Sequence, residues 1–450
     1  MSDSLRYPKG IAYIIATEAA ERFSYYGMRS ILTLYLVAQF FNPGHDPALQ
    51  AAAEAAANEK THLFVSLAYF MPVIGAVLAD ALFGRYRVIL VLSLVYCLGH
   101  LCLAVFDDHL DGFSFGLLLL AMGAGGIKAN VSAFVGSQFE GRLEQPGQPD
   151  LMAKAYGWFY FSINIGAVVS MASVPWLLEH MGPRVAFGVP GLFMLLATFV
   201  FWRGRRHYRH EPLPTLRFTR QRWQQLRSDL RAAARVLLVF AFIPAFWALW
   251  DQSQSEWVLQ AGKLDLELLP GLSLLPAQVQ LSNPLLVLLL IPLFTYRVYP
   301  FMRSLGLEPT PLRRIGTGLL VTALSFVVIA WIQGLVDAGH RPSVWWQLLA
   351  YAILTVGEVM VYITGLEYAY TQAPARLKSL LTAAWLLTVS IGNLAVSLIN
   401  GSIVDGGFFA QFSGAAYYWL FVKIMLAVTL GFAVTTAWLA RRDARRDSGT

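Results

Sequence analysis

The sequence predicts an all-α membrane protein, with twelve transmembrane helices in two bundles of six and both termini in the cytoplasm. The first observation is composition: 57% of the 450 residues are hydrophobic and 14% are charged. A soluble globular protein carries about 25% charged residues. The second observation is a series of long apolar segments, because about 20 such residues span a bilayer as a helix. The third is the uneven distribution of basic residues between the loops.

Twelve apolar segments follow one another along the chain. We expect helices rather than strands, because the segments are long and lipid permits only helices or closed barrels. A basic stretch divides the segments into a first set of six and a second set of six. They lie near 11–40, 59–82, 86–106, 113–138, 154–177, 185–203, 232–258, 279–302, 314–335, 343–373, 377–403 and 413–440.

The loops on one side of the predicted membrane carry most of the basic residues. The two termini and the loops after the even-numbered segments hold 26 Lys and Arg, whereas the other loops hold 4. Because basic loops remain in the cytoplasm, we expect both termini there. The formal net charge of +7 follows mostly from this bias, so we expect no nucleic-acid partner.

The basic stretch between the two sets indicates how the chain is organised. We expect an N-terminal six-helix bundle over 1–203, a cytoplasmic linker over 204–231 and a C-terminal six-helix bundle over 232–450. The second half of the linker could also form an amphipathic helix on the inner leaflet. A division into six plus six helices favours two repeats around a site near the middle of the membrane.

Ionised side chains in the first apolar segment indicate a functional site. Glu18, Glu21, Arg22, Tyr25 and Arg29 are spaced so that they share one stripe of a helix. A charge at the bilayer centre costs roughly 2.5–3.5 kcal/mol, so four facing lipid would cost about 10 kcal/mol. The stripe should therefore face protein or water. A purely structural ion-pair network is the alternative, although apolar residues would usually serve that purpose as well.

Further charges lie deep in other segments. With a rise of about 1.5 Å per residue, Lys128 in the fourth segment and Arg22 in the first are at similar depths. Arg29 is at a depth similar to that of Asp251 in the seventh segment, and Lys128 to that of Glu358 in the tenth. The first set is mainly cationic and the second acidic. A cavity with one positive and one negative wall suits a zwitterion.

Other polar and aromatic residues carry less weight individually. A single Asn or Tyr in a membrane helix is more often an interhelical hydrogen-bonding residue, and a single Trp is more often a packing residue or an interface anchor. His62 lies near the end of a segment, where a solvated histidine is as common as a functional one. The remaining candidates are Tyr69, Tyr160, Asn164, Trp247, Asn283 and Trp385.

Several motifs resemble a known family. The stretch "EAAERFSYYG" (18–27) is similar to the ExxERFxYYG signature of the proton-coupled oligopeptide transporters, within the major facilitator superfamily. "FYFSINIG" (159–166) resembles their second signature, FYxxINxG. "FWALWDQSQSEWVLQA" and "GLEYAYTQAPARLKSLLTAAWLLTVSIGN" resemble animal peptide transporters. Asp251 departs from the Glu of many bacterial members. The resemblance implies the major facilitator fold, in a compact twelve-helix form.

The resemblance also implies roles in proton coupling and gating. The proton-coupling residues would be Glu18, Glu21, Arg22 and His62. Arg29 with Asp251 resembles the outer gate pair, and Lys128 with Glu358 a second pair across the cavity. Burial favours the protonated form of a carboxyl group, whereas a neighbouring arginine favours the ionised form. A peptide carboxylate that engages Arg22 would thus favour protonation of Glu21.

The resemblance implies a substrate site with three parts. The peptide carboxylate would meet Arg22, Arg29 and Lys128. The peptide amino group would meet Asn164, Asn283 and Glu358. The pocket would be lined by Tyr26, Tyr69, Tyr160, Trp247 and Trp385.

We therefore expect a symporter that imports di- and tripeptides by alternating access, driven by protons and needing no other cofactor or metal. It should be a multi-pass protein of the cell membrane, of the bacterial inner membrane, and function as a monomer. The same fold could carry nitrate or an amino-acid derivative, but Glu358 suits an amine and repels nitrate. A membrane enzyme would need a metal cluster or a nucleophile with its base, and the sequence offers neither in a plausible setting. A receptor is the remaining alternative, which any measured flux would exclude.

Overall fold

Long helices form where the sequence is apolar. The computed structural model describes residues 7–42, 44, 47–141, 147–209, 220–372 and 378–447. The chain divides into two compact units. Unit 1 comprises Met1–Asn42 and Leu63–Phe218, and unit 2 comprises Pro43–His62 and Thr219–Thr450.

In its described residues, unit 1 contains five complete long helices and the second half of another. The label η marks short 3₁₀ or π-helical turns. The elements are α1 (Gly10–Tyr35), η2 (Leu36–Phe40), α2 (Pro47–Leu78), η3 (Ala79–Phe83), α3 (Arg85–Val105), α4 (Leu110–Ser137), α5 (Gln148–Met181), α6 (Pro183–Arg203) and η4 (Gly204–Arg206).

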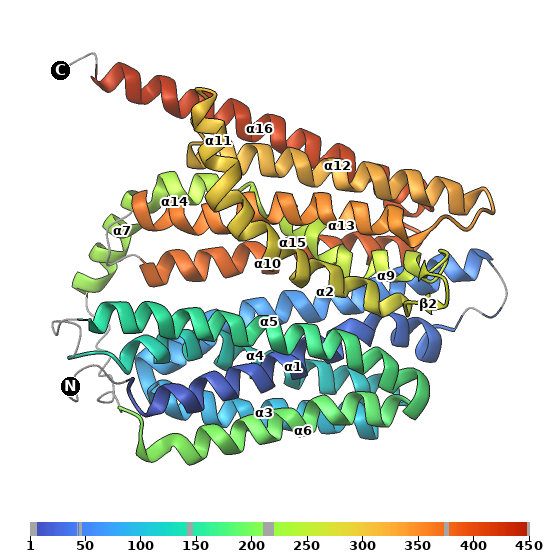
Figure 1. Ribbon diagram of the computed structural model, residues 1–450, viewed down its shortest axis with the longest axis horizontal. Helices are drawn as coiled ribbons and strands as arrows, with labels where there is room; N and C mark the ends of the chain where they lie inside the picture. The colour runs from blue at the N-terminus through green and yellow to red at the C-terminus, as the bar shows by residue number, and fades with distance from the viewer. Residues whose placement is uncertain are drawn as a thin grey trace. The chain divides into compact units, whose positions relative to one another are not determined.

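The long helices of unit 1 lie alongside one another as a bundle (Figure 1). Helix α1 packs against α5 and α6, and α3 packs against α4 and α6. Gly166 allows α5 to approach α1 closely, because a Cβ there would lie 2.6 Å from the carbonyl oxygen of Ala19. This contact fixes the helix that carries the charged stripe.

Unit 2 begins with the first half of α2 and continues from α7. Its further elements are α7 (Arg220–Phe240), α8 (Ile243–Trp250), η5 (Asp251–Gln254), α9 (Glu256–Ala261), β1 (Glu267–Leu269), β2 (Leu272–Ser273), η6 (Pro276–Leu281), α10 (Ser282–Leu293), η7 (Phe294–Val298), α11 (Tyr299–Ser304), α12 (Pro311–Asp337), α13 (Val344–Glu358), η8 (Val359–Ile363), α14 (Thr364–Gln372), α15 (Lys378–Val404), η10 (Phe408–Gln411) and α16 (Ala415–Asp447).

Four pairings organise unit 2: α12 packs against α13 and against α16, α8 packs against α15, and α10 packs against α13. The helix is interrupted between α7 and α8, and Pro244 occupies the first turn of α8. Proline lacks the N–H that would continue the preceding helix, and it is tolerated in a first turn. The interrupted helix places η5, with Asp251, in the interior of the unit.

The predicted helical membrane architecture is confirmed. Within the described residues, eleven helical segments are long and apolar enough to cross a membrane. Helix α1 is the twelfth long helix, and it carries the charged residues Glu18, Glu21, Arg22 and Arg29.

Two features differ from the sequence prediction. Helix α2 begins at Pro47 rather than near 59, because "PALQAAAEAAAN" is rich in alanine, the strongest helix former, without being apolar enough to read as a membrane segment. A two-stranded antiparallel hairpin joins α9 to η6. Its turn uses Gly271 at φ +82°, a backbone conformation that glycine adopts without strain.

The expected linker over 204–231 is described only in part. Residues 210–219 lie outside the described residues, and α7 begins at Arg220, within the expected linker. The domain boundaries expected from the sequence stay a prediction. Just after α6, Tyr208 is buried, and this burial raises the pKa of its hydroxyl above the usual value.

Candidate substrate and proton site

The charged stripe of α1 forms an ion cluster inside unit 1. The Nε atom of Arg22 lies 3.0 Å from Oε1 of Glu18 and 2.5 Å from Oε2 of Glu21. The exposed fractions of the three side chains are 8%, 5% and 0%, in the order Arg22, Glu18 and Glu21. The stripe therefore faces protein, as its helical spacing predicts.

Two aromatic rings hold the Lys128 ammonium. Its Nζ atom lies 3.8 Å from the centre of the Tyr25 ring and 3.9 Å from the centre of the Tyr69 ring. Small residues bring α2 and α4 together here, since a Cβ on Gly75 would lie 2.5 Å from the carbonyl oxygen of Gly125. A cation over an aromatic face is attracted by the ring quadrupole. The two rings and the ammonium thus form one group in unit 1, in which Tyr25 is buried and Tyr69 and Lys128 are half-buried.

The other predicted residues of unit 1 lie on α1 and α5. Arg29 is buried, with 2% of its surface exposed. Tyr26 is half-buried and stacks edge-to-face on Tyr25, with the ring centroids 5.4 Å apart. Asn164 is buried, and its Nδ2 donates a hydrogen bond to the Tyr160 carbonyl oxygen over 2.9 Å. The Tyr160 side chain is exposed on the surface of the unit.

In unit 2, Asn283 and Glu358 are brought together. The Nδ2 atom of Asn283 donates to Oε2 of Glu358 over 2.7 Å and to Oγ1 of Thr355 over 3.1 Å. Glu358 is the last residue of α13, directly before the π-helical turn η8. π-helical turns inside longer helices are frequent at functional sites. The wider turn follows the one carboxylate that the sequence placed deep in this helix.

Trp247 and Trp385 form an aromatic cluster with a third ring. Their ring centroids are 6.2 Å apart, at an interplanar angle of 84°. Tyr362 of η8 lies 5.9 Å from each of them. Edge-to-face and tilted arrangements of this kind are the favourable geometries for aromatic rings. Tyr362 was not among the predicted residues, although it is one helical turn after Glu358.

His62 lies in the first half of α2 and makes its contacts within unit 2. Its Nδ1 is 2.7 Å from Oδ1 of Asn393, and its Nε2 is 2.9 Å from Oγ of Ser255. The Nδ2 of Asn393 donates to Oδ2 of Asp251 over 2.6 Å. Because Asn393 donates toward Asp251, its oxygen faces His62 and accepts the Nδ1 proton. A continuous buried chain therefore joins the histidine to the aspartate.

The structure thus unites many predicted residues within each unit. It unites Glu18, Glu21 and Arg22; Tyr69 and Lys128; Asn283 and Glu358; Trp247 and Trp385; and, through Asn393, His62 and Asp251. The gate pairs expected from the sequence join residues of different units and stay predictions. In the described part of the chain, no three His, Cys, Asp or Glu side chains gather as a metal-ligand set.

Sequence reasoning missed several residues that the structure places in these groups. They are Ser255, Thr355, Tyr362 and Asn393. Tyr25 was recognised only as a member of the α1 stripe. Ser255 and Asn393 lie within the stretches that resemble peptide transporters, which is the one signal that could have drawn attention to them.

Comparison with known proteins identifies the family. A family model described as the POT family matches residues 86–225 and 214–420. Peptide transporter family 1 of Drosophila melanogaster is 36% identical over 370 residues, which cover 73% of this chain and 48% of the relative. Solute carrier family 15 member 2 of Mus musculus is 34% identical over 408 residues, covering 80% and 54%. The chain thus spans about half the length of these curated relatives.

A solved structure matches over nearly the whole length of both chains. The crystal structure in meso of the POT family transporter PepTSo superposes with a TM-score of 0.86 at 34% identity, covering 96% of this chain and 98% of that one. The long apolar helices of the described residues, the α1 motif and these matches agree. This chain belongs to the POT family.

Proposed function

We propose that this protein is a symporter that imports di- and tripeptides, coupled to protons, by alternating access. It acts as a monomer in the cell membrane, the inner membrane of a bacterium, with both termini in the cytoplasm. The coupling ion is the proton, and no other cofactor takes part. The Drosophila melanogaster relative, which is named as a peptide transporter, supports the substrate class.

The α1 ion cluster is the single observation that carries the proposal. Two carboxylates share one guanidinium in the interior of a membrane protein. Ionisable residues at this depth are costly and are associated with ion and proton pathways. A cluster with an excess carboxylate can exchange a proton without leaving an unpaired cation behind.

Complementary charge in the two units supports a zwitterionic substrate. In unit 1, Arg22, Arg29 and Lys128 provide cations for the peptide carboxylate. In unit 2, Glu358 receives the peptide amino group with the help of Asn283, and Asn164 contributes from α5. The side chains of Tyr26, Tyr69, Tyr160, Trp247 and Trp385 line the pocket.

Coupling follows from competition for Arg22. When the peptide carboxylate engages the guanidinium, Glu21 loses part of its counterion and binds a proton in its place. Peptide and proton then bind cooperatively, and the coupling is reciprocal. A membrane potential contributes about 2.3 kcal/mol per charge per 100 mV, so one proton can drive accumulation of a neutral zwitterion. Glu18 and His62 share in the proton transfer.

Gating uses charges of opposite sign in the two units. Arg29 with Asp251 forms the outer gate, and Lys128 with Glu358 forms a second pair. Rocking of one helical bundle against the other around a fixed site is the general pattern for transporters built from two repeats. Glu358 also disfavours nitrate as the substrate, because an anion gains nothing from a buried carboxylate.

Uptake by proteoliposomes tests the proposal. Glu21→Gln removes the titratable group but keeps the size of the side chain. The variant should lose uptake against a gradient yet keep counterflow, the exchange of peptide across the membrane without net proton movement. Uphill uptake that survives in Glu21→Gln would refute the coupling role, and a wild type without peptide flux would refute the function.

A further inference from the structure

The first half of α2 carries a polar stripe toward unit 2. Glu54, Asn58 and His62 follow one another at intervals of four residues, which places them on one face of the helix. Each makes a polar contact with a side chain from a later part of the chain. We call these three residues the α2 ladder.

The first two residues of the ladder bind charged partners near α9. The Nζ atom of Lys263 lies 2.8 Å from Oε1 and 2.9 Å from Oε2 of Glu54. Asn58 is fully buried, and its Nδ2 donates to Oε2 of Glu256. The Tyr418 hydroxyl donates to the other oxygen of Glu256 over 3.3 Å. The partners of these residues are thus an ammonium and a carboxylate seven residues apart.

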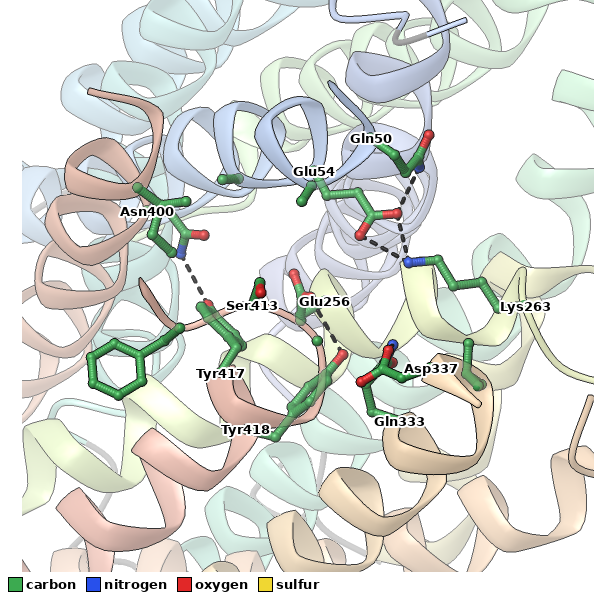
Figure 2. Close-up of a pocket in the computed structure, with 16 residues that line it drawn as sticks. Gln50, Glu54, Glu256, Lys263, Gln333, Asp337, Asn400, Ser413, Tyr417 and Tyr418 are labelled. Carbon is green, nitrogen blue, oxygen red and sulfur yellow. Dashed lines mark hydrogen bonds and ion pairs between the residues drawn. The ribbon is translucent and has the colours of Figure 1, made fainter. Parts of the chain in front are cut away.

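A cavity of about 560 Å³ lies beside this end of the ladder. Glu54, Glu256 and Lys263 are in its wall, and Figure 2 shows the ion pair on one side of it and the Tyr418–Glu256 bond on another. The side chains of Lys263 and Glu54 are 33% and 12% exposed. His62, by contrast, is 1% exposed. The ladder therefore runs from an accessible ion pair to a buried histidine.

Apolar packing can contribute only modestly to holding the first half of α2 on unit 2. Its sequence from 47 to 58 is "PALQAAAEAAAN", in which alanines predominate. A buried CH₂ group contributes about 0.8 kcal/mol. Ala53, Ala55 and Ala57 are buried and offer one methyl group each, whereas Ala51 and Ala52 are exposed. The polar contacts of Glu54, Asn58 and His62 therefore add directional attachment to the packing of these small side chains.

Resting on the proposed role of His62, we propose that Glu54 and Asn58 are positioning residues for proton coupling. By binding Lys263 and Glu256, they fix the register and orientation of α2. This holds the imidazole of His62 against its two partners in unit 2. Without the contacts of Glu54 and Asn58, the first half of α2 rotates or frays. The His62 side chain then loses its hydrogen bonds to Asn393 and Ser255.

Several titratable groups surround the ladder. Asp251 of η5 reaches His62 through Asn393 of α15. Glu256 of α9 adjoins Ser255, the other partner of the imidazole. Tyr418 of α16 donates to Glu256, and on α2 itself Glu59 and Lys60 lie between Asn58 and His62 in the sequence. A change at Glu54 or Lys263 therefore acts on His62 through geometry as well as through charge.

Charge reversal and swap test the proposal in proteoliposomes. Glu54→Lys and Lys263→Glu should each lower uphill uptake about threefold or more, as expected for loss of a partly exposed ion pair that also becomes repulsive. The double swap should restore most of the rate. Asn58→Ala should lower uptake about tenfold, because it leaves one oxygen of the buried Glu256 carboxylate without its donor. Lys60→Gln, on the same helix but off the ladder, is the control.

Histidine NMR on the same purified variants reports on the surroundings of His62 directly. The resonance of His62, assigned by its disappearance in His62→Gln, should change its chemical shift and titration midpoint in both single reversals. It should return toward the wild-type position in the swap and stay unchanged in Lys60→Gln. This readout does not depend on transport, so it applies even if a variant transports poorly.

The outcomes distinguish this proposal from the proposed function. An unchanged His62 signal in both reversals overturns the ladder whatever the uptake data show. A swap that restores neither the signal nor the uptake of a variant with normal counterflow also overturns it. If the wild type shows no uphill uptake, the proposed function fails, while the NMR comparison still decides whether the ladder positions His62.

Discussion

The Lys128 ammonium lies 3.8 Å from the centre of the Tyr25 ring, inside unit 1. The ring of Tyr69 holds the same ammonium from a second direction, at 3.9 Å. A desolvated cation–π contact is worth about 2 kcal/mol. Tyr25 is three residues from Arg22 on α1, so it links the lysine of α4 to the helix that carries the ion cluster.

We predict that the ring face of Tyr25, rather than its hydroxyl, matters for peptide binding. Tyr25→Leu should weaken equilibrium binding of a radiolabelled dipeptide about tenfold, which corresponds to about 1.4 kcal/mol. Tyr25→Phe keeps the aromatic face and should lose much less. An equal loss in both variants would assign the effect to the hydroxyl and contradict the cation–π explanation.

The α1 stripe shows which parts of the site could be predicted from spacing. Glu18 and Arg22 are four residues apart, so the helical period alone brings them together. Asn283 and Glu358 are 75 residues apart in the sequence, and His62 and Asn393 are 331 apart. No local period relates such pairs, so the packing of helices decides them. The family resemblance suggested a shared site for Asn283 and Glu358 but not their hydrogen bond, and it gave no role to Asn393.

The fold was predictable to the extent that hydropathy determines it. Long apolar segments became helices because lipid leaves few alternatives for the backbone. The early start of α2 at Pro47 was missed, because alanine favours a helix without marking a membrane segment. The short hairpin around Gly271 was missed because it lies in a connection between segments.

We predict that Glu358 recognises the amino group of the peptide. Glu358→Gln keeps the shape of the side chain and a hydrogen-bond acceptor but removes the charge. Hydrogen bonds to charged groups contribute about 1.5–3 kcal/mol, so dipeptide binding should weaken by about tenfold or more. Binding of N-acetylated analogues, which lack the ammonium, should change little.

Glu367→Gln provides the matched control for this measurement. Glu367 lies on α14 and pairs with Arg314, with 47% of its side chain exposed. Exposed pairs contribute at most about 1 kcal/mol, and dipeptide affinity should stay near the wild-type value. If Glu358→Gln weakens free and N-acetylated peptides equally, the proposed contact with the amino group is wrong.

A pair of glycines on α5 predicts a contrast in stability. A Cβ on Gly166 would lie 2.6 Å from the Ala19 carbonyl oxygen and 3.0 Å from the Phe23 backbone nitrogen. Because backbone atoms cannot easily move, Gly166→Ala should lower the free energy of unfolding by about 1–3 kcal/mol. Gly157 has nothing within 4 Å of its Cβ position. Gly157→Ala should be neutral or slightly stabilising, since alanine is the better helix former.

Thermal unfolding in detergent, followed by the fluorescence of the native tryptophans, measures this contrast. The Gly166→Ala variant should unfold at a lower temperature than wild type, and Gly157→Ala at the same or a higher temperature. Similar midpoints for the two variants would mean that the close approach of α5 to α1 does not limit stability.

Asn393 should matter for coupling beyond its effect on stability. It accepts from His62 and donates to Asp251, both inside unit 2. Asn393→Ala leaves a buried histidine and a buried carboxylate each short of a partner, at a cost of about 1–3 kcal/mol or more. The chain between the two titratable groups is then cut. Uphill uptake should therefore fall more than counterflow, and the pH profile of uptake should change.

Asn400→Ala distinguishes this role from the general loss of a buried amide. Asn400 is on the same helix, is 1% exposed, and donates to the Tyr417 hydroxyl over 3.0 Å. Asn400→Ala should lower the stability of the protein. It should reduce uphill uptake and counterflow by the same factor, because the contacts of His62 remain intact. If Asn393→Ala also lowers both activities equally, with an unchanged pH profile, then Asn393 only supports the packing of α15. The chain from His62 to Asp251 would then take no part in proton movement.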